Sequence, residues 1–231
     1  MVNRKSPAPG ATTPARLTRR QRLAAADTAL AAADTAMAML VQRFGPAAVP
    51  VRRLPGGHYG ALAQAIAHQQ LAGAAAAAIH GRFVALFDDG APSPAAVVAL
   101  PDSALRSAGL SGAKVAAIRD LAERVVDGRV RLDDLARRGD DEVIDRLVTV
   151  RGIGRWTAEM FLIFTLGRFD VWPVDDLGVR AGFARAHSWR ELPRPRELAA
   201  LGDKYRPWRS VAAWYCWQAA GDKGLVVGRP T

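Results

Sequence analysis

The chain has 231 residues, half of them hydrophobic, and a formal net charge of +10. This length suits one large domain or two lobes around a sizeable core. The single cysteine, Cys216, excludes a disulfide framework, a cysteine zinc site and a four-cysteine iron–sulfur cluster. No apolar run reaches the roughly 20 residues of a membrane span. The basic balance favours a polyanionic partner, of which nucleic acid is the commonest.

Basic residues are concentrated at the start of the chain. Six of them precede the first acid, Asp27: Arg4, Lys5, Arg16, Arg19, Arg20 and Arg22. The segment lacks the apolar core that a secretory signal needs. We interpret residues 1–20 as a disordered basic tail that adds non-specific affinity for phosphate, although a solvated tail without a role fits equally well. Residues 21–231 are expected to form one folded domain.

Helical spacing dominates this domain, which is rich in alanine. The first predicted element is one long helix that ends at Gly45 and Pro46. Two helices follow within 58–87, with a break near 70–73. Ser93 and Asp102 are predicted N-caps of two short helices, and a longer helix ends at Gly128.

The second half of the domain has the same character. Two short segments, 132–138 and 140–150, open with acids, which suit a helix N-terminus. A helix over 155–166, a helix that starts at a pair of aspartates and two more within 195–221 complete the chain. The pattern therefore predicts an all-α fold.

A sharp glycine turn lies between two of these helices, in the stretch "VRGIGRWTAEMFLIF". Gly152 and Gly154 can adopt positive φ and allow another backbone to come close. The helix that begins near Arg155 leaves unpaired N–H groups at its start, and such an end binds a phosphate. Arg151 and Arg155 add charge, so the turn is a candidate grip on a nucleic-acid backbone. An ordinary turn between two helices fits the spacing equally well.

Two adjacent carboxylates, Asp175 and Asp176, follow the extended lead-in "WPV" at the start of the next helix. One of them is explained as an N-cap of that helix. The second carboxylate has no such ready structural explanation, and it is a candidate for chemistry.

These motifs together resemble a known family. The run from Leu147 to Ala158, followed by "PVDDLGVR" from Pro173, is similar to the helix-hairpin-helix DNA glycosylases, and most similar to their DNA-3-methyladenine glycosylase II branch. The resemblance covers about residues 50–231 and is strongest over 146–183 and 205–218. It implies a two-lobed all-α fold with a DNA-facing cleft, here without the separate N-terminal β-rich domain that relatives often carry. The family hairpin usually has proline at the position of Arg151.

The resemblance assigns the catalytic carboxylate to Asp176 and leaves Asp175 as a cap or support. Breaking an N-glycosidic bond builds positive charge on the sugar, which a fixed carboxylate stabilises while it orients the attacking water. Bifunctional relatives have a lysine, which forms a Schiff base, where this chain has Trp156. The resemblance therefore implies a monofunctional enzyme without cofactor or metal. It also assigns the backbone grip to Arg151, Gly152, Gly154, Arg155 and Thr157.

A flipped base needs a stacking pocket, and a wedge must fill the hole that it leaves. The resemblance implies a pocket of Trp156, Met160 and Trp217, whose indole faces suit a cationic alkylated base. It places the wedge at Gln70, with Leu71 as the alternative, while loop polars or caps remain a simpler explanation of this glutamine pair. We expect His68 to form a local hydrogen bond, Trp172 to lie at the rim, and core packing for Trp189, Trp208 and Trp214.

The sequence thus predicts a monofunctional DNA glycosylase for base excision repair, which excises 3-methyladenine and related alkylated bases from double-stranded DNA. We expect a monomer in the bacterial cytoplasm, associated with the nucleoid and not with a membrane. A glycosylase of the same fold for another lesion and a non-catalytic helix-hairpin-helix DNA-binding protein remain the alternatives. A scaffold protein is a third, which the hairpin glycines and the tryptophan cluster argue against. The basic run Lys204, Arg206 and Arg209 is typical of a solvated basic surface, and its position close to a helix start at Pro207 makes it also a candidate phosphate contact.

Overall fold

The computed structural model describes residues 17–71 and 73–222. All regular elements in these ranges are helices, which confirms the predicted all-α class. They are α1 (Arg19–Ala33), α2 (Thr35–Phe44), α3 (Gly57–His68), α4 (Gly73–Val84), α5 (Pro94–Ala99), α6 (Asp102–Ser107), α7 (Gly112–Val126), η1 (Leu135–Arg137), α8 (Asp140–Leu147), α9 (Arg155–Phe164), α10 (Leu177–Ala186), α11 (Pro195–Leu201), η2 (Asp203–Tyr205) and α12 (Arg209–Gly221).

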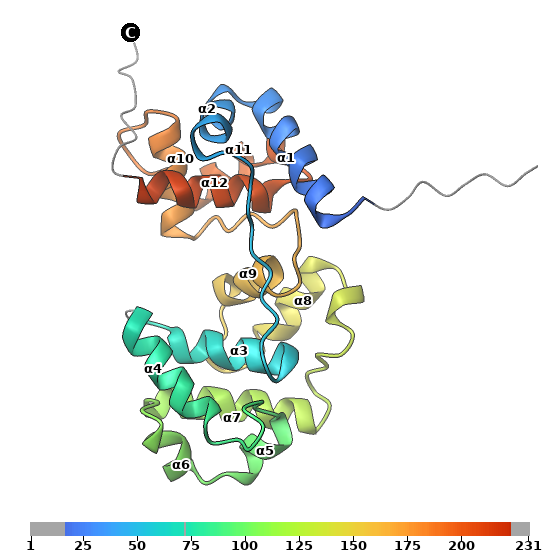
Figure 1. Cartoon of the computed structure of the whole chain (residues 1–231), viewed down its shortest axis with the longest axis vertical. Helices are drawn as coiled ribbons and strands as arrows, with labels where there is room; N and C mark the ends of the chain where they lie inside the picture. The colour runs from blue at the N-terminus through green and yellow to red at the C-terminus, as the bar shows by residue number, and fades with distance from the viewer. Residues whose placement is uncertain (1–16, 72, 223–231) are drawn as a thin grey trace, which may run out of the picture.

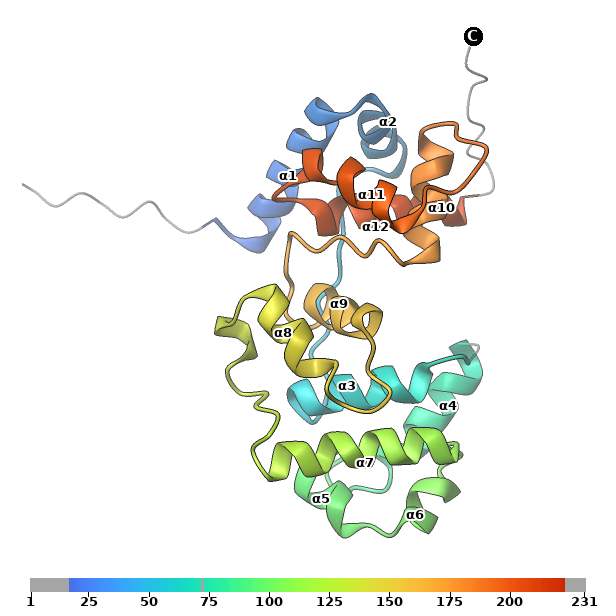
Figure 2. The same cartoon turned by 180° about the vertical axis from the view of Figure 1, so that it is seen from behind.

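The helices form two lobes (Figure 1). One lobe combines the first and the last described helices, because α1 and α2 pack against α12 and α2 also contacts α10. The other contains α3 to α7, in which α7 packs on α3 and α5. Helices α8 and α9 lie between them and α9 contacts α3, as the opposite view also shows (Figure 2). The connection over 45–56 crosses from one lobe to the other, so the site between the lobes is built from segments far apart in sequence.

The predicted single helix before Gly45 is wrong, because it is broken at Asp34. This residue is extended, with φ −157°, and its side chain caps α2 by accepting from Ala36 N. Its carboxylate also binds the side chains of Lys204, Tyr205 and His187. Burial alone would raise the pKa of Asp34, but these hydrogen bonds outweigh it and hold the pKa well below its usual range. The break therefore joins α1 and α2 to the other end of the chain.

The folded domain begins before the expected boundary at residue 21. Thr18 forms a capping box with Gln21, so α1 begins at Arg19. The Arg19 guanidinium donates to Gly167 O and Val49 O, at 3.1 and 3.0 Å. Arg19 therefore belongs to the folded domain, whereas residues 1–16 lie outside the described ranges.

Helices α10 and α12 cross closely, and one glycine makes this possible. A Cβ on Gly182 would lie 1.7 Å from Cys216 O, so any side chain would force the helices apart. The close crossing sets the start of α10, which Asp176 caps, against the face of α12 that carries Trp217. The packing of one lobe thereby determines where the candidate catalytic carboxylate lies.

Of the remaining predictions for single residues, the structure confirms some and contradicts others. Ser93 caps α5 as predicted, but Pro101 and not Asp102 is the N-cap of α6. Trp172 is not at the rim: it is buried, and its indole donates to Leu198 O at 2.8 Å. Trp189 is not a core residue, because 43% of it is exposed. Trp208 and Trp214 pack against the core as expected.

Candidate active site

The Asp176 carboxylate lies at the start of α10 and is almost fully buried. Its Oδ1 accepts from Val179 N and from the indole Nε1 of Trp217, both at 2.8 Å. Its Oδ2 accepts from the indole Nε1 of Trp156 at 2.7 Å. Two carboxylate oxygens offer about four hydrogen-bond acceptor positions. These three donors therefore leave one acceptor position, which can bind a water molecule. The carboxylate is thus fixed in place and keeps one acceptor position free.

One role expected for the aspartate pair is wrong, namely that of Asp175 as the helix cap. Asp176 itself is the N-cap of α10, whereas Asp175 is exposed in the preceding turn. The Asp176 backbone accepts the helix bond from Arg180 N, and its side chain bonds the third residue of the helix. Capping and candidate catalysis therefore use the same carboxylate, because its second oxygen remains directed to Trp156.

Trp217 is held against Asp176 by the absence of a side chain at Gly178. A Cβ there would lie 2.8 Å from Cδ1 of Trp217 and 3.1 Å from Oδ1 of Asp176. On its other side, the Trp217 ring packs on Phe164, with centroids 5.5 Å apart. The indole therefore extends from the carboxylate to the end of α9, and Gly178 provides the space for this contact.

The hairpin places Gly152 in the left-handed region, with φ +77°, as expected. A Cβ there would approach Ala117 Cβ to 3.0 Å. Gly154 differs from the expectation: its φ is −93°, and it caps α9 without a side-chain hydrogen bond. Nothing lies within 4 Å of a Cβ on Gly154. The start of α9 is therefore open beside Gly154, as a helix N-terminus that receives a phosphate needs to be.

The two hairpin arginines have different neighbours. Arg151 is exposed, and its backbone N–H donates to Oδ2 of Asp120 on α7 at 2.8 Å, which fastens the turn. Arg155 donates to Oε1 of Glu159 at 3.0 Å, but 57% of its side chain remains exposed. Both side chains can thus reach a phosphate. The Thr157 hydroxyl lies inward, since the residue is buried, which leaves only its backbone N–H for such a contact.

Glu159 is the most unusual acid beside the site. It is 2% exposed, and its Oε2 is buried without a hydrogen-bond partner among the described residues. Burial raises the pKa of Glu159 to about 7, although Arg155 partly offsets this effect. The charges of Asp175 and Asp176 add to the increase. Sequence reasoning missed this residue, because nothing in its local pattern distinguishes it from a surface glutamate of α9.

The candidate wedge lies in the turn after α3. Gln70 is exposed with φ +57°, which is unusual for a residue with a Cβ, and Leu71 is 37% exposed. Gln69 Nε2 donates to Gly152 O at 2.9 Å, so this turn is tied directly to the hairpin. Lys114 Nζ donates to Ala67 O at 2.8 Å and fixes the end of α3. Gln69 and Lys114 were not predicted as site residues, because their partners lie far away in the sequence.

A cavity of about 230 Å³ lies between α3, α9 and the crossing connection. Met160 lines it as expected, together with Arg52, Gln64, His68, Phe161 and Phe164. Trp156 and Trp217 are not part of its wall. They lie on the Asp176 side, and Trp217 adjoins the cavity through Phe164. The three residues predicted to form the base pocket therefore lie in two places: the indoles at the carboxylate, and Met160 in the cavity next to them.

The basic side chains of the run after α11 form ion pairs with acidic residues of the folded domain. Lys204 pairs with Asp34, Arg206 pairs with Asp170 and Asp203, and Arg209 pairs with Asp170. The run therefore forms ion pairs within the fold and is not only a solvated basic surface, and its phosphate contact stays a prediction. Over the described ranges, no group of three or more His, Cys, Asp or Glu side chains could hold a metal ion. No described helix is long and apolar enough to cross a membrane.

Comparison with known proteins agrees with this architecture. Residues 63–207 match the model of the HhH-GPD superfamily of base excision DNA repair proteins. DNA-3-methyladenine glycosylase 1 of Schizosaccharomyces pombe is 36% identical over 164 residues, which are 70% of this chain and 72% of that protein. DNA-3-methyladenine glycosylase 2 of Escherichia coli is 27% identical over 56% of this chain and 43% of its own length.

Solved structures give the same result. The S. pombe 3-methyladenine DNA glycosylase in complex with abasic DNA superposes with a TM-score of 0.75 at 33% identity, over 84% of this chain and 95% of that one. A DNA-3-methyladenine glycosidase from Bacillus halodurans superposes with a TM-score of 0.77 at 33% identity, over 85% and 89%. With more than half of its residues matched by the family model, the chain belongs to the HhH-GPD superfamily of base excision DNA repair proteins.

Proposed function

We propose that this protein is a monofunctional DNA glycosylase that excises 3-methyladenine and related alkylated bases from double-stranded DNA. The observation that carries the proposal is the buried Asp176 carboxylate, which two indole N–H groups and one backbone N–H hold in place. Relatives whose names specify 3-methyladenine support the substrate class. We further propose that the protein is a monomer and that it acts on the nucleoid in the bacterial cytoplasm.

The proposed reaction assigns a role to each part of the site. The start of α9 and the hairpin hold the DNA backbone, and Gln70 or Leu71 fills the place of the flipped nucleotide. Positive charge then develops on the deoxyribose as the N-glycosidic bond breaks, and Asp176 stabilises it. The open acceptor position on the carboxylate orients the water that attacks C1′. An alkylated purine that already carries positive charge leaves as a neutral base and needs no protonation.

Trp156 supports a reaction that ends at the abasic site. Its indole donates to Asp176, and it stands where a lyase would need an amine to form a Schiff base. Attack by water leaves a hydroxyl group on C1′ and does not cut the DNA strand. Strand cleavage should therefore appear only after alkali or heat treatment.

The test is base release from methylated duplex DNA by the wild type and by Asp176→Asn. Asparagine retains the cap to Val179 N but removes the charge, so release of 3-methyladenine should fall at least 100-fold while DNA binding is maintained. Strand breaks should form only after alkali. Equal release by Asp176→Asn would refute the catalytic role, whereas binding without release by the wild type would favour another lesion or a non-catalytic DNA-binding protein.

A further inference from the structure

Within residues 17–71 and 73–222, two buried side-chain polar atoms have no hydrogen-bond partner. One is Nε2 of His68, contrary to the local bond expected from the sequence, and the other is Oε2 of Glu159. Glu159 lies one turn after Arg155 on α9, the helix whose start is the proposed phosphate site. A buried polar atom without a partner is costly. The proposed mechanism assigns Glu159 no part, although its carboxyl contacts an arginine that is proposed to hold the DNA backbone.

The Arg155 guanidinium is attached to Glu159 through one of its three nitrogens. Its Nε donates to Oε1 of Glu159 at 3.0 Å, while 57% of the Arg155 side chain and 3% of the Glu159 side chain are exposed. The two terminal nitrogens of Arg155 donate to no residue in the described ranges. Because a guanidinium presents its donors in a rigid planar fork, a bond at Nε fixes the direction of the whole group. The terminal nitrogens therefore remain available to the oxygens of a DNA phosphate.

Other charged groups face the Glu159 carboxyl from the elements packed against α9. They line a cleft of about 400 Å³ together with Arg155 and Glu159, and they are Asp140, Asp141, Asp170, Arg206 and Arg209. Arg206 and Arg209 pair with Asp170. Asp140 pairs with Arg168. Arg155 is therefore the cation of this cleft that pairs with Glu159. The charges of Asp175 and Asp176 act in the opposite sense and disfavour ionisation of the carboxyl.

Arg155 is thus placed between two anions, the Glu159 carboxylate and a DNA phosphate. The ionised carboxylate neutralises the guanidinium and repels the phosphate, whereas a protonated carboxyl leaves the full positive charge to the phosphate. By thermodynamic linkage, a bound phosphate must in turn favour the protonated carboxyl. Oε1 accepts from Arg155, so the proton belongs on the unpartnered Oε2. Burial raises the pKa of Glu159 to about 7, and both forms of the carboxyl are therefore populated near neutral pH.

We propose that Glu159 is a positioning residue for the phosphate contact: its carboxyl directs the Arg155 guanidinium toward the DNA backbone, and it takes up a proton on Oε2 when the phosphate binds. This inference rests on the proposed function, in which the start of α9 holds the DNA backbone. The proton comes from solvent, and no bond of the DNA changes. Below the pKa of Glu159, about 7, the carboxyl is already protonated and leaves the affinity for DNA unchanged. As the pH rises above this value, the carboxylate forms and the affinity falls.

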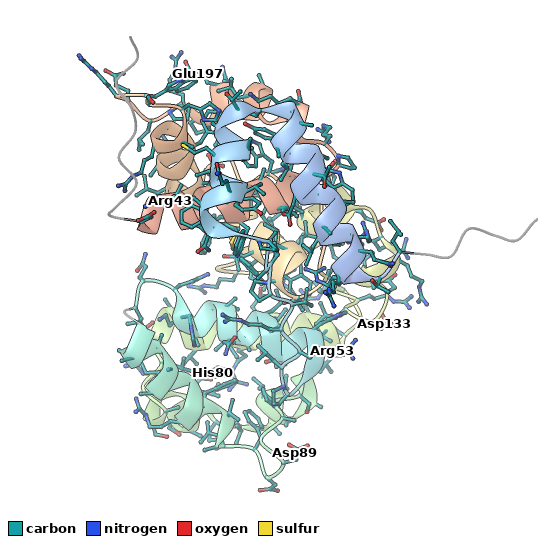
Figure 3. The ribbon with its side chains drawn as sticks, turned by 45° about the horizontal axis from the view of Figure 1, so that its top comes forward. Arg43, Arg53, His80, Asp89, Asp133 and Glu197 are labelled. Carbon is teal, nitrogen blue, oxygen red and sulfur yellow. The ribbon has the colours of Figure 1, made fainter. Side chains whose placement is uncertain are left out.

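The test measures the dissociation constant of duplex DNA that contains a tetrahydrofuran analogue of an abasic site, from which no base can be released. Binding is measured at pH 6 and pH 8.5 at one fixed salt concentration, because phosphate contacts depend on salt. Glu159→Gln retains an oxygen that accepts from Arg155 but cannot ionise. Glu197→Gln is the matched control, since Glu197 also pairs with an arginine at a helix start, Arg194, but both side chains are exposed. Figure 3 shows Glu197 at the outer end of its lobe, away from the other lobe.

The ratio of the wild-type to the Glu159→Gln dissociation constant separates this carboxyl from other groups that titrate in the same range. The ratio should be close to about 1 at pH 6 and rise to about 5 to 10 at pH 8.5, the effect of one neutralised charge contact. Glu197→Gln should match the wild type at both pH values. In an Arg155→Met background, Glu159→Gln should change the affinity less than about twofold, because the carboxyl acts through the guanidinium.

A ratio that does not change with pH, or weaker binding by Glu159→Gln at both pH values, would overturn the inference. Calorimetry of wild-type binding at pH 7.5, in two buffers of different ionisation enthalpy, counts the protons taken up and tests the inference even if Glu159→Gln fails to fold. We expect uptake of up to about one proton by the wild type and less by Arg155→Met. Equal uptake by the two proteins, or none by the wild type, would also overturn it.

Base release from methylated duplex DNA, measured in parallel with the wild type, keeps the two proposals apart. Release of 3-methyladenine together with a ratio that is independent of pH would refute this inference and leave the proposed function intact. Binding of the duplex without release of any base would refute the proposed function, while the ratio would still decide the role of Glu159. A wild type that does not bind the duplex would overturn both.

Discussion

Trp156 donates its indole N–H to Oδ2 of Asp176 at 2.7 Å, across a separation of 20 residues in the sequence. Although it was expected only as a wall of the base pocket, 46% of the residue is exposed and its polar edge binds the carboxylate. Trp217 does the same for Oδ1. The two tryptophans are therefore positioning residues for Asp176, in addition to any contact with a base. Hydrogen bonds to a charged group are about twice as strong as neutral ones.

Replacing Trp156 with phenylalanine separates these roles, because it keeps an aromatic face but removes the donor. We expect single-turnover release of 3-methyladenine to fall about 10-fold, in line with the loss of one hydrogen bond to a charged group. The unfolding temperature should change little, since the residue is half exposed. Trp189→Phe, also half exposed, is the control and should keep full activity. An unaltered rate in Trp156→Phe would mean that the indole N–H has no role in catalysis.

Gln69 links the turn after α3, which carries the proposed wedge, to the hairpin, so its removal should impair base flipping more than DNA binding. In Gln69→Ala we expect the excision rate on duplex DNA to fall about 5- to 10-fold, the value of roughly 1 kcal/mol for one hydrogen bond. Fluorescence of 2-aminopurine beside the lesion would report a smaller flipped fraction. Gln42→Ala, on the exposed surface of α2, is the matched control. Normal flipping with weaker binding would show that Gln69 serves the hairpin alone.

Glu159 should make the stability of the protein depend on pH. Its pKa is raised to about 7 in the folded state, above the roughly 4.3 of an unfolded glutamate. The folded state therefore binds the extra proton between these values, and stability falls as pH rises through this window. Glu159→Gln should remove this slope and raise the free energy of unfolding at pH 8 by about 1–3 kcal/mol.

Urea unfolding of wild type and Glu159→Gln at pH 5 and pH 8 measures the effect. The amide oxygen can still accept from Arg155, so the two proteins should differ little at pH 5. Glu191→Gln, an exposed substitution, controls for the loss of one negative charge. If the wild type and Glu159→Gln have the same pH dependence, the buried carboxyl does not titrate in this range.

The basic tail lies outside the described residues, and its contribution is best tested by deleting residues 2–16. A cut at residue 20 would also remove Arg19, whose guanidinium binds Gly167 O and Val49 O in the fold. If Arg4, Lys5 and Arg16 contact phosphates, affinity for duplex DNA should fall. The slope of log K against log salt concentration should then flatten by up to about 3. An unchanged salt slope would show that the tail makes no phosphate contact.

Much of the candidate site was predictable from the sequence, because several of its features depend only on residues that are close together in the chain. Helical periodicity, the left-handed Gly152 and the N-cap at the aspartate pair all depend on neighbouring residues, and resemblance to a family added the proposed roles of Asp176 and Trp156. Local reasoning failed where a distant partner changed the outcome. Asp34 breaks a helix that its neighbours would continue, because Lys204, Tyr205 and His187 bind its carboxylate from the other end of the chain.

The sequence alone determined that the chain is helical, that it carries a glycine hairpin, and that an acid begins the helix downstream. These features follow from side-chain spacing and backbone conformation. Only the tertiary structure decided that Asp176 and not Asp175 is held by both tryptophans, that Gln69 joins the turn after α3 to the hairpin, and that Arg52 and His68 line the same cavity. Each of these depends on the packing of segments distant in sequence, and long-range packing is not encoded in any local pattern.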